Sequence, residues 1–154
     1  MKAKNQTIIF GFYMFISMVA LFFLMKLVGL EKVTELRLLN IVIAVLFSNR
    51  LAKNNINSGT QRSSYLGNLG SLMLANLIAV FASALGLMIY GTAIDKGLMD
   101  VIGNGFFLGE NLTINQVAIA VILEGSAAAA IVSFSLMQYW KNTEVRTKSV
   151  ERKV

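Results

Sequence analysis

Glu124 is the acidic residue that lies deepest inside an apolar stretch of this sequence, and a carboxylate there can bind a proton or a cation. A charge in such a setting costs several kcal/mol unless it is paired or protonated. Its helical neighbours at three- and four-residue spacing are small or apolar, which indicates a packed face. Those neighbours are Ala120, Val121, Ala127 and Ala128. The structural alternative is a hydrogen-bonded clasp between helices or subunits, and the scarcity of other polar groups at depth favours it.

The depth of Glu124 predicts its partners. It lies about nine residues from the outer end of its helix, which is roughly 13 Å down at the rise of an α-helix. Ser83 and Ser17 lie at a similar depth on two other predicted helices. Asn40 and Lys26 start nearer the surface, although Lys26 can reach inward along its apolar stem. The predicted polar site therefore comprises Glu124, Ser83, Ser17, Asn40 and Lys26.

The composition gives little support for redox, metal or catalytic chemistry. The chain has no cysteine and no histidine, which excludes disulfides, thiol catalysis, histidine-based zinc sites and histidine general bases. The glycines around Gly103 and Gly109 do not match a dinucleotide or phosphate-binding loop. No pair of titratable groups is spaced as nucleophile and base. We therefore expect no enzyme activity, no cofactor and no metal.

Long apolar blocks must position these residues. Hydrophobic residues make up 56% of the 154-residue chain and charged residues 14%, whereas soluble domains carry about 25% charged residues. The blocks cover about residues 7–30, 36–51, 65–94 and 114–140, and most are long enough to cross a bilayer as helices. We predict an all-α membrane bundle of four helices in one domain, 1–140, followed by a basic tail, 141–154. The second block is short and polar at both ends, so a re-entrant segment is its alternative.

The distribution of Lys and Arg predicts the orientation. Ten of these residues lie on one proposed side: Lys2, Lys4, Arg50, Lys53, Arg62, Lys141, Arg146, Lys148, Arg152 and Lys153. Four lie on the other: Lys26, Lys32, Arg37 and Lys96. Because cytoplasmic segments carry the excess of positive charge, both termini are expected in the cytoplasm. This effect accounts for the net charge of +6 better than a nucleic-acid partner does.

Small residues recur on the last two predicted helices. Apolar surface gains little from association within lipid, so close backbone approach must hold such helices together. This spacing predicts that helices 65–94 and 114–140 pack as an antiparallel pair. The packing residues are Ala75, Ala79, Ser83 and Gly86 on the first, and Gly125, Ala129 and Ser133 on the second.

Three stretches carry a resemblance to a known family. They are Glu35-Leu36-Arg37-Leu38-Leu39-Asn40, then Tyr65-Leu66-Gly67 with Gly70, then Leu123-Glu124-Gly125 with Ser133-Phe134-Ser135-Leu136-Met137-Gln138-Tyr139. Together they resemble a bacterial family of small four-span membrane proteins catalogued as domain-of-unknown-function family 4199. The resemblance covers nearly the whole chain and implies a multi-pass protein of the bacterial inner membrane. It implies no activity, cofactor or catalytic residue.

The sequence thus favours a non-enzymatic membrane accessory or scaffold subunit. Its expected partners are the lipid bilayer and other membrane proteins or further copies of itself. The alternative is a small proton- or ion-coupled transporter that uses the intramembrane Glu124.

Overall fold

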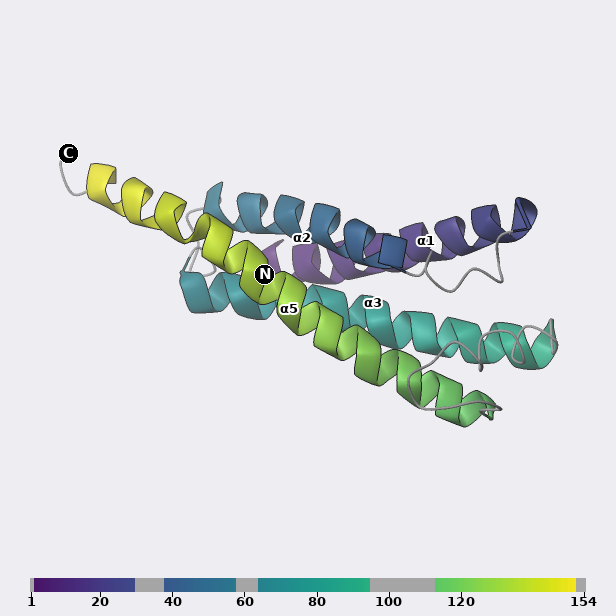
Figure 1. The fold of residues 1–154 in the computed structure, drawn as a ribbon. Coiled ribbons are helices and arrows are strands. Elements are labelled where there is room, and N and C mark those ends of the chain that lie inside the picture. Colours follow the sequence, from purple (N-terminus) through teal and green to yellow (C-terminus); the bar gives the residue numbers. More distant parts are fainter. Residues whose placement is uncertain (1, 30–37, 58–63, 95–112, 152–154) are drawn as a thin grey trace.

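The computed structural model describes residues 2–29, 38–57, 64–94 and 113–151, with side chains for 5–29, 38–57, 64–94 and 113–141. These residues form the helices α1 (Lys2–Leu27), α2 (Leu39–Asn57), α3 (Tyr65–Ala93) and α5 (Ile114–Glu151) (Figure 1). The predicted all-α fold is confirmed for this part of the chain. Of the basic residues used to predict the orientation, Lys32, Arg37, Arg62, Lys96, Arg152 and Lys153 lie outside it.

Two helices have ends with a clear local cause. The α1 helix ends at Leu27 rather than at residue 30, because Gly29 has a φ of 74°, a left-handed conformation that glycine tolerates best. Its amide bonds the Lys26 carbonyl at 3.1 Å. At the start of α3, the Ser64 hydroxyl accepts a hydrogen bond from the Gly67 amide at 3.3 Å and caps the helix.

The other two helices extend further along the chain than the sequence suggested. Helix α2 ends at Asn57 instead of Leu51, and its last turns are rich in polar residues that lie between the second and third predicted blocks. Helix α5 continues to Glu151, so most of the expected basic tail is helical. The predicted boundaries followed the loss of hydrophobicity, but no proline interrupts either helix, and polarity alone does not end a helix.

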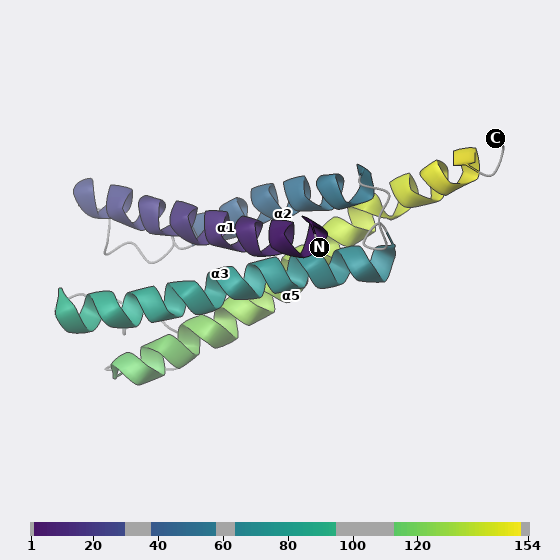
Figure 2. The same cartoon turned by 180° about the vertical axis from the view of Figure 1, so that it is seen from behind.

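The helices form a bundle in which α1 packs on α2 and α3, while α5 packs on the same two helices from the other side. Helices α1 and α3 run in the same direction, because Gly11 faces Ala75 at one end and Lys26 bonds Tyr90 at the other. Figures 1 and 2 show that α5 crosses the bundle obliquely. The bundle therefore widens toward the end where α1 and α3 finish and α5 begins.

The narrow half of the bundle holds the main apolar core. All four helices contribute to it through Met14, Leu51, Ala52, Leu69, Leu72, Ala75, Ala79 and Met137. The backbones approach so closely that a Cβ at Gly11 would lie 2.9 Å from the carbonyl oxygen of Ala75. Small residues permit this approach, as expected for helices that associate in lipid.

Three helices are long and apolar enough to cross a membrane: α1 over Asn5–Leu27, α3 over Tyr65–Ala93 and α5 over Ile114–Lys141. Large apolar side chains also cover their outer faces, including Ile16, Leu85 and Ile131. Among the described helices, α2 does not reach this level of hydrophobicity, because its second half is polar. The structure thus contains three of the four predicted spans as helices that could cross a membrane, and α2 is not a candidate span by the same measure.

Candidate functional site

A cavity of about 500 Å³ occupies the wide half of the bundle, and all four helices line it. Most of its wall is apolar, with aromatic rings and thioethers from α1 and branched side chains from the other helices. Five lining residues carry polar groups: Asn40 on α2, Asn76, Ser83 and Tyr90 on α3, and Glu124 on α5. An apolar pocket with a few converging polar groups is the usual form of a small-molecule site.

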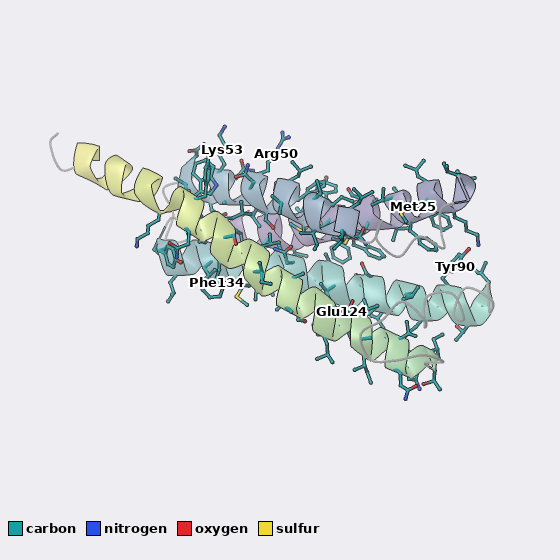
Figure 3. All side chains as sticks on the ribbon, viewed as in Figure 1. Met25, Arg50, Lys53, Tyr90, Glu124 and Phe134 are labelled. Carbon is teal, nitrogen blue, oxygen red and sulfur yellow. The ribbon has the colours of Figure 1, made fainter. Side chains whose placement is uncertain are left out.

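Helix packing sets the position of Glu124. The next residue, Gly125, lies against α3 so closely that a Cβ there would be 2.8 Å from both methyl groups of Val80. This contact places Glu124 level with the middle of α3, less than one turn from Ser83. Glu124 is an exposed residue of α5 and lines the cavity; Figure 3 labels it on that helix.

The structure brings three of the five predicted site residues to this cavity. Glu124, Ser83 and Asn40 line it together, and the Ser83 hydroxyl lies 3.9 Å from the sulfur of Met18. Ser17 is half-buried on α1 and does not line the cavity. The next residue, Met18, contacts Ser83 and lines the cavity, whereas Ser17 lies outside the lining.

Lys26 is placed beside the cavity instead of inside it. Its ammonium donates a hydrogen bond of 2.5 Å to the Tyr90 hydroxyl and lies 5.0 Å from the centre of that ring. The rings of Phe22 and Phe23 pack edge-on against Tyr90. Lys26 therefore supports an aromatic cluster at the wide end of the cavity.

Asn40 has an incompletely satisfied side chain. Its Oδ1 atom is buried and has no hydrogen-bond partner among the residues that the structure describes. Such an atom carries a desolvation penalty and calls for an explanation, such as a ligand. Since the terminal torsion of asparagine is soft, rotation can turn this oxygen toward the cavity that the residue lines.

The predicted packing residues lie at two interfaces of α3, one with α5 and one with α1. Gly125 of α5 meets Val80, but Gly86 faces the ring of Phe15 on α1, 3.5 Å from its would-be Cβ. The other members are partly or fully buried: Ala75, Ala79, Ser83, Ala129 and Ser133. Ser133 has a buried hydroxyl without a hydrogen-bond partner among the described residues.

A row of buried amides between α2 and α3 was not predicted. Asn76 donates to the Ser48 hydroxyl at 2.8 Å, and Asn55 donates to the Asn68 side chain at 3.0 Å. Asn68 also donates to the Ala52 carbonyl at 3.5 Å. The available signal was spacing: Ser48 and Asn55 lie two turns apart on one helix, as do Asn68 and Asn76 on the next.

This arrangement is suited to binding. The described residues include no group of three or more possible metal-ligating side chains. The cavity combines an apolar wall with acceptor atoms, which fits an amphipathic molecule or an ion. No protein-family model matches the chain, and no curated protein or solved structure matches it. The resemblance to family 4199 stays a prediction.

Proposed function

We propose that this chain is a non-catalytic membrane accessory or scaffold subunit that binds other membrane proteins, or a second copy of itself, through the outer face of α1. The observation that carries the proposal is the stripe formed by Ile9, Phe12, Tyr13 and Ile16, whose side chains are 47–57% exposed. In the most apolar stretch of each span, 11% of the residues of α1 are buried, against 28% for α3 and 33% for α5. Among these three spans, α1 thus has the most surface available for contact with another helix.

Tyr13 favours a protein over lipid on this face. Tyr13 is 54% exposed, lies within the first half of the Asn5–Leu27 span, and its hydroxyl makes no hydrogen bond to a described residue. Hydrocarbon offers no hydrogen-bond partner to such a group, and a neighbouring helix does. Branched and aromatic side chains around it provide the contact area that helix association in lipid requires.

The proposal includes a four-span topology with both termini in the cytoplasm of a bacterial inner membrane, as the resemblance to family 4199 implies. The amide bonds to α3 support a crossing by α2, because they give Ser48 and Asn55, two buried polar residues of its second half, hydrogen-bond partners within the bundle. Arg50 and Lys53 point away from the bundle in the C-terminal half of α2 (Figure 3). Positive charge there agrees with a cytoplasmic side.

A photo-crosslinking amino acid placed at Ile16 tests the α1 interface in intact membranes. The matched control is Leu85, a comparably exposed apolar position on the outer face of α3. We expect a discrete protein adduct from Ile16 and lipid adducts from Leu85, and the mass of the adduct distinguishes a second copy from another protein. Lipid adducts alone from both positions would rule out this interface.

Topology can be tested separately because the chain has no native cysteine. A cysteine at Asn5 and one at Asn57 should both be protected from an impermeant thiol reagent added outside the cell. Labelling of Asn57→Cys alone would place the end of α2 outside and overturn the four-span arrangement.

A small proton- or ion-coupled carrier is the second candidate, and the cavity favours it. Glu124 lines that cavity with Asn40 and Ser83 at a similar depth. Substrate-driven proton flux in reconstituted vesicles tests this candidate with Glu124→Gln, which keeps the size and the hydrogen bonding but cannot ionise. Equal flux in both proteins would remove the carrier hypothesis.

A further inference from the structure

We infer that the cavity between the helices is a binding site for a neutral aromatic alcohol, whose hydroxyl donates to the side-chain oxygen of Asn40 and whose ring lies among the aromatic and thioether side chains of α1. The site goes beyond the scaffold proposal and does not require transport. It rests on an unsatisfied acceptor, on the rings and sulfur atoms of the lining, and on the apolar helices that surround it.

The side-chain oxygen of Asn40 calls for a hydrogen-bond donor. It is buried and has no partner among the described residues, so it carries a desolvation penalty in the empty protein. Rotation about the soft terminal torsion can turn it toward the cavity that Asn40 lines. An amide oxygen accepts hydrogen bonds and cannot donate them. A ligand that satisfies it must therefore carry an O–H or N–H group.

The register of α2 against α3 brings a second polar group to the same level. Asn76 of α3 bonds Ser48 of α2, and Asn40 lies a little over two turns from Ser48, about 12 Å nearer the wide end. The same step along the antiparallel α3 leads from Asn76 to the turn that holds Ser83. The Ser83 hydroxyl has only a weak contact with the sulfur of Met18, at 3.9 Å, and can donate to an oxygen of the ligand. A hydroxyl head, which both donates and accepts, suits this level of the cavity.

The wall around this level favours an aromatic body. Four rings and two thioethers line the cavity: Phe15, Phe22, Phe23, Tyr90, Met18 and Met25. Aromatic rings pack favourably against one another edge-on or offset, and a thioether sulfur makes favourable contacts with a ring edge. The volume of about 500 Å³ falls within the usual range of ligand pockets. A ring therefore gains more from this wall than a plain hydrocarbon chain of similar size.

The surrounding helices favour a neutral ligand. Three of the four lining helices are apolar enough to cross a membrane, so a ligand that enters from the bilayer must first dissolve in hydrocarbon. A charged head pays heavily for that step, whereas a phenol is uncharged at neutral pH. The preference of the Asn40 oxygen for a donor is the same whether Glu124 is charged or neutral.

Calorimetric titration of the full chain in nanodiscs of neutral lipid tests the inference, with empty nanodiscs as the partitioning background. The probes are 4-propylphenol, 4-propylanisole, in which a methyl group replaces the hydroxyl hydrogen, and 1-heptanol, which has the donor but no ring. We expect saturable binding of propylphenol, binding of propylanisole that is about tenfold weaker or more, and weaker binding of heptanol than of propylphenol.

Three variants assign the binding to this cavity. Asn40→Leu should weaken propylphenol binding by about tenfold and leave propylanisole binding unchanged, because only the phenol uses the oxygen. Asn54→Leu makes the same chemical change at an exposed position of α2 and should alter neither affinity. Ala128→Phe fills the cavity and should abolish saturable binding of both probes. Fluorescence of Trp140, which bonds Asn49 across two helices, reports that each variant is folded before titration.

The outcomes that would overturn the inference are distinct. Absence of saturable propylphenol binding would exclude the site. Equal affinities for propylphenol and propylanisole, or unchanged propylphenol affinity in folded Asn40→Leu, would exclude the donor to Asn40. Heptanol binding as tight as that of propylphenol would exclude the preference for a ring, and saturable binding that persists in folded Ala128→Phe would place the ligand elsewhere.

Discussion

The close approach of Gly125 to Val80 gives the sharpest prediction about the stability of the bundle. In Gly125→Ala the new methyl would lie 2.8 Å from both methyl carbons of Val80, well inside the separation of about 3.5–4.0 Å that carbon atoms prefer. Forcing a core apart in this way costs about 1–3 kcal/mol. Alanine recovers up to about 1 kcal/mol because it restricts the unfolded chain more than glycine does. We expect a net loss of about 1–2 kcal/mol in the free energy of unfolding.

Three further variants identify the cause of that loss. Val80→Ala removes the two methyl groups, so the pair Gly125→Ala and Val80→Ala should be less destabilised than the sum of the single variants. Gly11→Ala should cost more and resist rescue, since its Cβ would lie 2.9 Å from the backbone oxygen of Ala75, which truncation of a side chain cannot remove. Gly70→Ala is the matched control, because nothing lies within 4 Å of its would-be Cβ.

Unfolding by a denaturing detergent in mixed micelles, followed by the fluorescence of Trp140, measures these differences. Trp140 is the single tryptophan of the chain, and its indole donates a 2.8 Å hydrogen bond from α5 to Asn49 on α2. Its emission should therefore change when the helices separate. If Gly125→Ala were as stable as Gly70→Ala, the close approach of α3 and α5 would be refuted.

Two other predictions concern polar contacts between helices. Asn76→Leu should destabilise the fold by about 1–2 kcal/mol because it leaves the Ser48 hydroxyl without its donor. Adding Ser48→Ala should then cause little further loss of stability. A double-mutant cycle in the same unfolding assay measures the coupling energy of the two residues, and additive losses would contradict the hydrogen bond. The hydrogen bond and ring contact between Lys26 and Tyr90 should contribute less than about 1 kcal/mol; a double-mutant cycle of Lys26→Met and Tyr90→Leu in that assay measures this pair alone, and a larger coupling energy would contradict the prediction.

Residue counting predicted the level of the candidate site but not its full membership. Because each residue of an α-helix adds a fixed rise, the sequence distance from the end of a helix gives the depth of a residue in the bundle. Glu124 and Ser83 accordingly line one cavity. Counting does not give the rotation of each helix about its axis. Ser17 therefore lies at a suitable depth on α1 but outside the lining, while Asn76 lies inside it.

The polar half of α2 shows why hydrophobicity alone misplaces a helix. Ser48 lies in the polar end of the predicted block 36–51 and Asn55 lies beyond that block, yet both are almost completely buried. Their polar groups are bonded by residues far along the chain, Asn76 and Asn68. A helix end inferred from composition is therefore wrong wherever a neighbouring helix supplies the hydrogen bonds that water would otherwise provide.

Asn76 connects the two halves of the bundle. It bonds Ser48 and the Leu72 carbonyl within the closely packed half, and it also lines the cavity of the wide half. Nearer the wide end, the side-chain oxygen of Asn40 on α2 has no hydrogen-bond partner among the described residues. The amide bonds therefore fix α2 to α3 up to Asn76 and leave the cavity end of α2 held by apolar contacts alone among the described side chains.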